Sequence, residues 1–216
     1  MNPDFDAAAT RAAETLIKYG VKSAPVSPLS ILEKMDNVII KPFAEIFDSE
    51  DENLCALLDT FGRSEGAVSS VHQMGGKPWY VVAYNGFLPH SMIQHALARE
   101  LGHIILRHET ASPENTAEAT CFAQHLLCPR PLIHSLQATG MRITKDVLAN
   151  LTGIFHQCLI CLRRTPGTAV PAGTNRFLRG QFMPFTMNLF EYYQTAKPED
   201  GSALADFGTF MDGYEE

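Results

Sequence analysis

The chain has 216 residues, 45% of them hydrophobic, which is enough for one or two globular domains with a buried core. Its 17 basic and 24 acidic residues give a net charge of −7 and exclude a broad basic surface for nucleic acid. The first residues lack the basic segment and apolar run of a secretion signal, and the apolar stretch at 154–162 is too short to span a membrane. Because five cysteines without such a signal indicate reduced thiols, we expect a cytoplasmic protein.

The beginning of the chain predicts two helices. Alanine and leucine recur at helical spacing over residues 4–19, and Gly20 is suited to end that helix. In the stretch 25–35, Ser27 can cap a second helix that has Pro28 at its first position.

Three β-rich runs follow. The run NVIIKPF at 37–43 predicts a strand. The runs at 66–74 and 78–85 are separated by Gly-Gly-Lys, a spacing that is typical of a β-hairpin. We therefore expect a small antiparallel sheet in this part of the chain.

The remainder is predicted to be mostly helical. A long helix is expected over about 89–107, and a second amphipathic helix over 114–129, ended by two prolines. Residues 143–164 predict two short helices with a break at Thr152-Gly153. A loop rich in Gly, Pro and Thr is expected at 165–175, and an apolar pattern resumes at 179–193.

The stretch HALARELGHIILRH, residues 95–108, ends like the zinc-peptidase helix H-E-x-x-H. On a helix, residues four apart project from one side, so two imidazoles can hold a zinc ion while the glutamate reaches the metal-bound water as general base. Glu100 and His103 keep this spacing, but Arg99 stands where the first histidine belongs. Gly102 would allow a neighbouring helix or strand to approach closely.

The surroundings of this helix make the match more specific. YNGFLP at 84–89, ALARELGHIILRH at 96–108 and AEATCFAQHLLCP at 117–129 together resemble the ImmA/IrrE family of bacterial zinc metallopeptidase-like proteins. The likeness covers about residues 10–165. The matching positions are Tyr84, Asn85, Ala98, Glu100, Leu101, Gly102, His103, Leu106, His108, Glu118, Ala119, Phe122, Ala123, Leu126, Leu127 and Pro129.

This resemblance implies a gluzincin-like site, with Glu100 as general base and His103 and Glu118 as zinc ligands. Members of the family are associated with mobile elements and stress responses, and they relieve repression by cleaving, or acting on, a helix-turn-helix repressor. The implied fold is α+β and mostly helical, with a zincin-like active-site helix packed on a small antiparallel sheet and a helical C-terminal part.

Three regions follow from this comparison. Residues 1–135 correspond to an ImmA/IrrE-like metallopeptidase-fold domain, and residues 136–196 to a helical C-terminal subdomain. Residues 197–216 form an acidic, Gly-rich tail that we expect to be mobile, or to become ordered only on a partner.

Arg99 departs from the family pattern and bears directly on activity. A guanidinium stays protonated and offers no free lone pair, so Arg99 cannot bind zinc. Two protein ligands remain, one short of the usual three plus water, and we expect weak or no hydrolysis. Without zinc, Arg99 would offset the charges of Glu100 and Glu118, with Glu118 as the expected partner.

Two alternatives stay open. In the first, the chain is an active zinc endopeptidase whose missing ligand is replaced by His125 or Cys121, which share a helix face with Glu118. His95 is about 12 Å from His103 along the helix, too far to share an ion. In the second, residues 143–164 form a helix-turn-helix that binds DNA, although its second helix would be apolar rather than basic.

Overall fold

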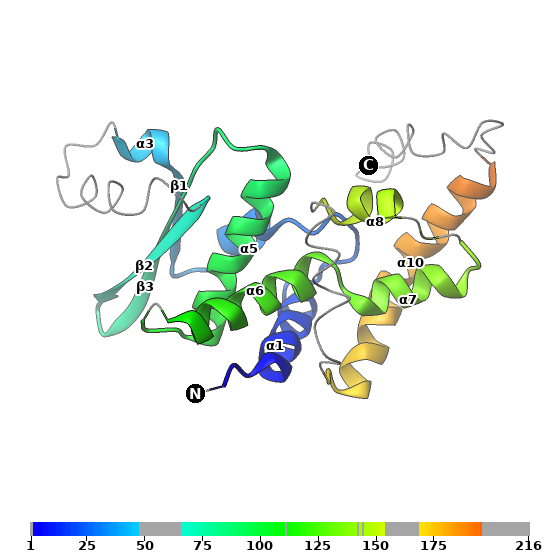
Figure 1. Ribbon diagram of the computed structural model, residues 1–216, viewed down its shortest axis with the longest axis horizontal. Coiled ribbons are helices and arrows are strands. Elements are labelled where there is room, and N and C mark those ends of the chain that lie inside the picture. Colours follow the sequence, from blue (N-terminus) through cyan, green and yellow to red (C-terminus); the bar gives the residue numbers. More distant parts are fainter. Residues whose placement is uncertain are drawn as a thin grey trace.

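Helices dominate the fold, and one small sheet lies at one end of the molecule (Figure 1). The computed structural model describes residues 2–47, 66–110, 112–141, 143, 145–153 and 169–195. The elements in chain order are α1 (Phe5–Lys18), α2 (Pro28–Glu33), β1 (Val38–Pro42), α3 (Phe43–Phe47), β2 (Ala67–Met74), β3 (Lys77–Tyr84), α5 (His90–Leu106), α6 (Pro113–Leu127), α7 (Arg130–Ala138), α8 (Lys145–Thr152) and α10 (Ala172–Thr195). The α+β, mostly helical class expected from the sequence is confirmed.

The ends of the first two helices follow from local chemistry. Asp4 caps α1 by accepting the backbone N–H of Ala7 at 2.9 Å, and Gly20 follows its C-terminal end with a φ of 63°. Ser27 caps α2 by accepting the N–H of Ser30 at 3.2 Å, as predicted.

The sheet is mixed rather than antiparallel. Its order is β1-β3-β2; the hairpin strands β2 and β3 are antiparallel, but β1 pairs with β3 in parallel. The hairpin turn is formed by Gly75 and Gly76, whose positive φ values of 60° and 75° suit a two-residue turn between twisted strands. In the sequence, α3 and the segment up to residue 65 separate β1 from the hairpin, so no tight turn joins β1 to β3. A connection of that length permits parallel pairing of the two strands.

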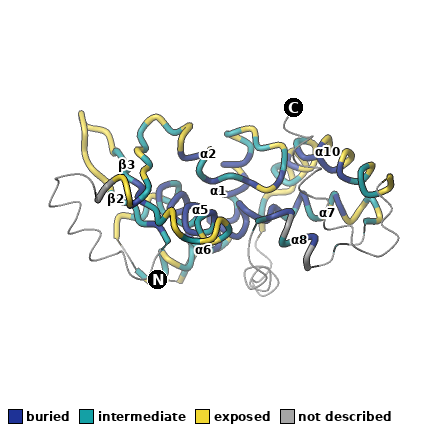
Figure 2. The backbone as a smooth tube through the Cα atoms, turned by 90° about the horizontal axis from the view of Figure 1, so that it is seen from above, coloured by how far each residue is buried: buried dark blue, intermediate teal, exposed yellow. Residues whose placement is uncertain are grey.

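Helix α5 lies between the sheet and α6, with α1 packed on the other side of α6. Gly102 makes the α5–α6 approach possible, as expected: a Cβ at this position would lie 3.1 Å from the backbone oxygen of Ala119. Figure 2 shows buried residues concentrated along α1, α5 and α6 at the centre of the molecule. The helix that carries the motif is therefore rigidly held from both sides.

The C-terminal half contains a helix that the sequence did not predict. Pro129 and Pro131 were expected only to end α6, yet Pro131 lies in the first turn of α7, where a missing N–H has no cost. Helix α10 packs on α7 and α1 and already begins at Ala172, inside the expected loop at 165–175.

One hydrophobic core runs through both proposed regions, and the predicted boundary after residue 135 falls inside α7.

The predicted helix break at Thr152-Gly153 is confirmed, since α8 ends at Thr152 and Gly153 has a φ of 63°. The second half of the 143–164 helix pair and the tail at 197–216 lie outside the described residues. None of the helices in the described part of the chain has the length and apolarity that a membrane span requires.

Candidate functional site

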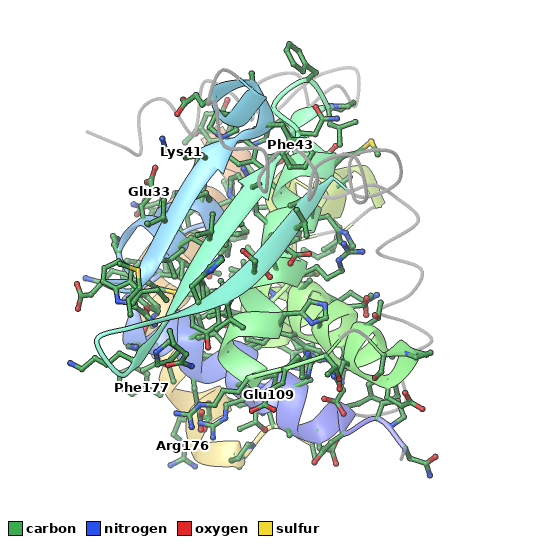
Figure 3. The ribbon with its side chains drawn as sticks, turned by 90° about the vertical axis from the view of Figure 1, so that its left-hand side faces the viewer. Glu33, Lys41, Phe43, Glu109, Arg176 and Phe177 are labelled. Atoms are coloured by element: carbon green, nitrogen blue, oxygen red, sulfur yellow. The ribbon has the colours of Figure 1, made fainter. Side chains whose placement is uncertain are left out.

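A cavity of about 370 Å³ lies between the sheet and the motif helix. Figure 3 looks onto the sheet from this end of the molecule and labels Glu109, one of the lining residues. The lining comprises Ala67, Val68, Ser69, Ser70, Val71 and Tyr80 from the sheet, Arg99, Glu100, His103 and Ile104 from α5, and His108, Glu109, Thr110 and Thr116 beyond it. The cavity thus brings the E-x-x-H residues of α5 against strand β2.

Glu100 is buried at the base of this cavity, with 5% of its surface exposed. The Ser69 hydroxyl donates to its Oε2 at 2.6 Å, and Arg99 Nη2 contacts its Oε1 at 3.3 Å. Burial raises the pKa of Glu100, while the hydrogen bond from Ser69 and the charge of Arg99 oppose that rise. The carboxylate is therefore a stronger base than an exposed one, and protein donors hold both of its oxygens.

Ser69 was not anticipated from the sequence. It pairs with the buried Val82 across the hairpin, so both side chains face the same side of the sheet. That side faces α5, which positions the Ser69 hydroxyl for Glu100. The only sequence signal is strand alternation, which places Ala67, Ser69 and Val71 on one face.

A second set of contacts joins the end of α5 to α6. His103 Nδ1 and His108 Nδ1 are 2.9 Å apart, and His108 Nε2 lies 3.1 Å from Glu118 Oε2. The other carboxylate oxygen of Glu118 accepts the backbone N–H of Asp4 at 2.7 Å. His108 connects the two residues that the family resemblance names as ligands.

Hydrogen bonds link Glu118 to His103 through His108. The Glu118 carboxylate can only accept, so His108 donates from Nε2. Of the two Nδ1 atoms of His103 and His108, one donates and the other accepts. Burial, with the charges of His108 and Arg99, lowers the pKa of His103 to about 4, so this ring is neutral at pH 7.

The arrangement does not fit a zinc ion. Arg99 occupies the position of the first ligand and, among the described residues, forms an ion pair with Glu100 rather than with the expected Glu118. His103 Nδ1 and both oxygens of Glu118 are engaged in hydrogen bonds. Among the described residues, no three His, Cys, Asp or Glu side chains are grouped so that they could hold a metal ion.

The suggested replacement ligands lie elsewhere. His125 is about 10 Å further along α6 than Glu118 and lines a separate cavity. The Cys121 thiol donates to the backbone oxygen of Phe5 in α1 at 3.7 Å, and burial raises its pKa to about 11. Sharing a helix face with Glu118 is therefore not enough to make a residue a replacement ligand, and neither His125 nor Cys121 completes a site with His103.

Comparison with protein-family models, with curated proteins and with solved structures found no match to this chain in any of the three. The ImmA/IrrE resemblance thus depends on the motif residues themselves. The structure adds that Glu100 and His103 line one cavity, and that Glu118 is linked to it through His108.

Proposed function

We propose that this chain is a regulatory protein of the ImmA/IrrE type, whose peptidase-like cleft binds a protein partner with little or no hydrolysis. The observation that carries the proposal is the ion pair of Arg99 with Glu100 at 3.3 Å. A cation of the protein stands where the first metal ligand would be and neutralises the carboxylate that would act as general base. The cleft is thereby stable without a metal.

The strand beside the cleft suits a peptide partner. In the described part of the chain β2 is an edge strand of the sheet, and its residues Ala67–Val71 line the cavity. An edge strand can pair with an extended segment of another protein. Val71 and Met74 on β2 are 49% and 55% exposed, so they offer apolar contacts to such a segment. By resemblance, the partner is a helix-turn-helix repressor.

The first test concerns metal. The zinc content of the protein is measured after purification without chelators and without added zinc, together with Arg99→His and Arg99→Gln. We expect less than stoichiometric zinc in the parent and in Arg99→Gln, which removes the guanidinium without supplying a ligand. Arg99→His restores the H-E-x-x-H pair and should bind zinc at least tenfold more tightly than Arg99→Gln. Equal zinc affinities in the two variants would show that Arg99 does not stand at a ligand position.

The second test concerns the partner. The purified chain is incubated with candidate helix-turn-helix repressors, and the mixture is followed by size-exclusion chromatography and gel electrophoresis. We expect a complex with an intact repressor, weakened when Val71→Asp places a charge on the exposed part of β2. Cleavage of the repressor that disappears in Glu100→Gln would instead establish an active peptidase.

A further inference from the structure

A second cavity lies on the other side of α6, between α1, α6, α7 and α10. Its volume is about 190 Å³, and it shares no lining residue with the cleft at Glu100. Its polar lining comes from His125, Arg130, His134, Asn175 and Arg179. The other lining residues are Ala9, Ala13, Leu16, Pro129, Pro131, Ala169, Val170 and Leu178. Nothing in the proposed function uses this cavity.

The charged side chains that line this cavity are all basic. Two guanidinium groups and two imidazoles line it, without an Asp or Glu, in a chain whose net charge is −7. Within the described residues, neither Arg130 nor Arg179 forms an ion pair with a carboxylate. Asp6 lies beside the lining, since its carboxylate accepts the backbone N–H of Ala169 at 2.8 Å. Cations gathered without a counter-charge favour the binding of an anion.

The polar atoms of the lining are mainly donors. Arg179 Nη2 donates to His134 Nδ1 at 3.2 Å, which leaves the Nε2 atom of His134 as the donor of this ring. No other contact between described residues uses the remaining N–H groups of Arg179 or the five of Arg130, so these can donate to a ligand. Asn175 already donates its amide to the backbone oxygen of Val170 at 3.0 Å. A ligand for this set of donors must itself be an acceptor.

The backbone contributes little to the site. Helix α7 begins here, but the N–H groups of Leu132 and Ile133 already donate to the oxygen of Pro129, and Pro131 has none. The positive end of the α7 dipole adds to the positive potential, and the N–H of Arg130 is the one backbone donor of this first turn that none of the contacts above uses. Recognition therefore falls to the arginine side chains, whose planar donor forks match an oxyanion.

The size of the cavity limits the ligand. A volume of about 190 Å³ holds more than one water molecule, whose share of the liquid is about 30 Å³, but is smaller than the pockets of roughly 300–1,000 Å³ that take drug-sized ligands. The fully buried Leu16 and the 1% exposed Leu178 form apolar walls, whereas Arg130 is half-buried and Arg179 and His134 are exposed at the cavity. We propose that this cavity binds a small phosphate group, free or as a phosphate monoester, between Arg130 and Arg179.

The experiment measures phosphate binding by isothermal titration calorimetry at pH 7, with inorganic phosphate and with glycerol 3-phosphate at constant ionic strength. We expect saturable binding of at least one of them. Tighter binding of glycerol 3-phosphate would identify a monoester site, and tighter binding of inorganic phosphate a site for the free ion. Arg130→Gln and Arg179→Gln should each raise the Kd at least tenfold.

Arg176→Gln is the matched control. Arg176 lies on the same helix as Arg179, is exposed, and does not line the cavity, so this variant changes the net charge by the same amount (Figure 3). It should bind phosphate like the parent, as should Glu100→Gln, which alters only the cleft. In the parent, the His134 imidazole resonances should also shift on titration, a measurement that needs no variant.

Two results would overturn the proposal. One is the absence of saturable binding by either phosphate compound to the folded parent. The other is an equal loss of affinity in Arg176→Gln and Arg179→Gln, which would reduce the effect to net charge.

Discussion

Removing Arg99 tests whether this side chain stabilises a buried carboxylate in place of a metal. The side chains of Arg99 and Glu100 are 18% and 7% exposed, and their contact is 3.3 Å long. Residues next to each other on a helix project in different directions, and this contact is longer than the roughly 2.7–2.9 Å of a strong charge-assisted hydrogen bond. Ser69 remains as the second donor to Glu100 in any Arg99 variant.

The expected magnitude follows from these contacts. Leaving a buried group without one of its partners costs about 1–3 kcal/mol. Because Ser69 still donates and the lost contact is long, we expect Arg99→Ala to lower the free energy of unfolding by about 1–2 kcal/mol, within that range. Glu100→Gln removes the charge but keeps an oxygen that accepts from Ser69. In the Glu100→Gln background, the cost of Arg99→Ala should therefore fall by about 1 kcal/mol.

The assay is urea denaturation at pH 7 of four proteins: the parent, Arg99→Ala, Glu100→Gln and the double variant. The four free energies of unfolding form a double-mutant cycle, which separates this pair from the other contacts of Arg99. Effects that add within about 0.3–0.5 kcal/mol would refute the reasoning, since independent sites behave in this way. The m-value should stay constant, because none of the changes alters the surface exposed on unfolding.

Gly102→Ala should lower the free energy of unfolding by about 1–3 kcal/mol in the same assay, because its Cβ would lie 3.1 Å from the backbone oxygen of Ala119. Gly180→Ala in α10, where no atom lies within 4 Å of the new Cβ, is the control and should be neutral or stabilising by about 1 kcal/mol; similar losses in both variants would contradict the packing argument. Burial and the charge of Arg130 lower the pKa of His125 to about 4 in the folded protein. Between about pH 6.5 and 4, therefore, only the unfolded chain takes up a proton at His125. The free energy of unfolding should fall as the pH drops through this window. His125→Gln should reduce the dependence of the free energy of unfolding on pH there, and an unchanged slope would show that His125 does not contribute.

The elements that the sequence predicted are those set by local chemistry. The cap at Ser27, the Gly75-Gly76 turn and the long amphipathic helix α5 are each determined by residues close together in the chain. The parallel pairing of β1 with β3 depends on contacts between residues about 42 positions apart, such as Val38 and Tyr80, which no local pattern encodes. Helix α7 was missed because a proline that ends one helix can equally stand in the first turn of the next.

The candidate site likewise has features that the sequence predicted and features that it did not. Helical spacing predicted that Glu100 and His103 would share one cavity, because both lie on α5. The hydrogen bond from Ser69 could not be predicted, since it depends on how the hairpin packs on that helix. The role of His108 was open for the same reason: its contact with Glu118 crosses from the end of α5 to α6. Which of two carboxylates Arg99 contacts is likewise a matter of side-chain geometry after packing.

The two carboxylates that the family resemblance assigns to catalysis and to metal binding are both satisfied by the protein itself. Glu100 is held by Ser69 and Arg99, and Glu118 by His108 and the backbone of Asp4. A metal site needs carboxylate and imidazole lone pairs that point inward without partners, and such groups repel one another when the ion is absent. Here each of these carboxylates has a donor, so the cleft reaches its stable arrangement before anything binds. We therefore propose that this cleft gains little from taking up zinc, and that it holds a regulatory protein through its shape and its edge strand.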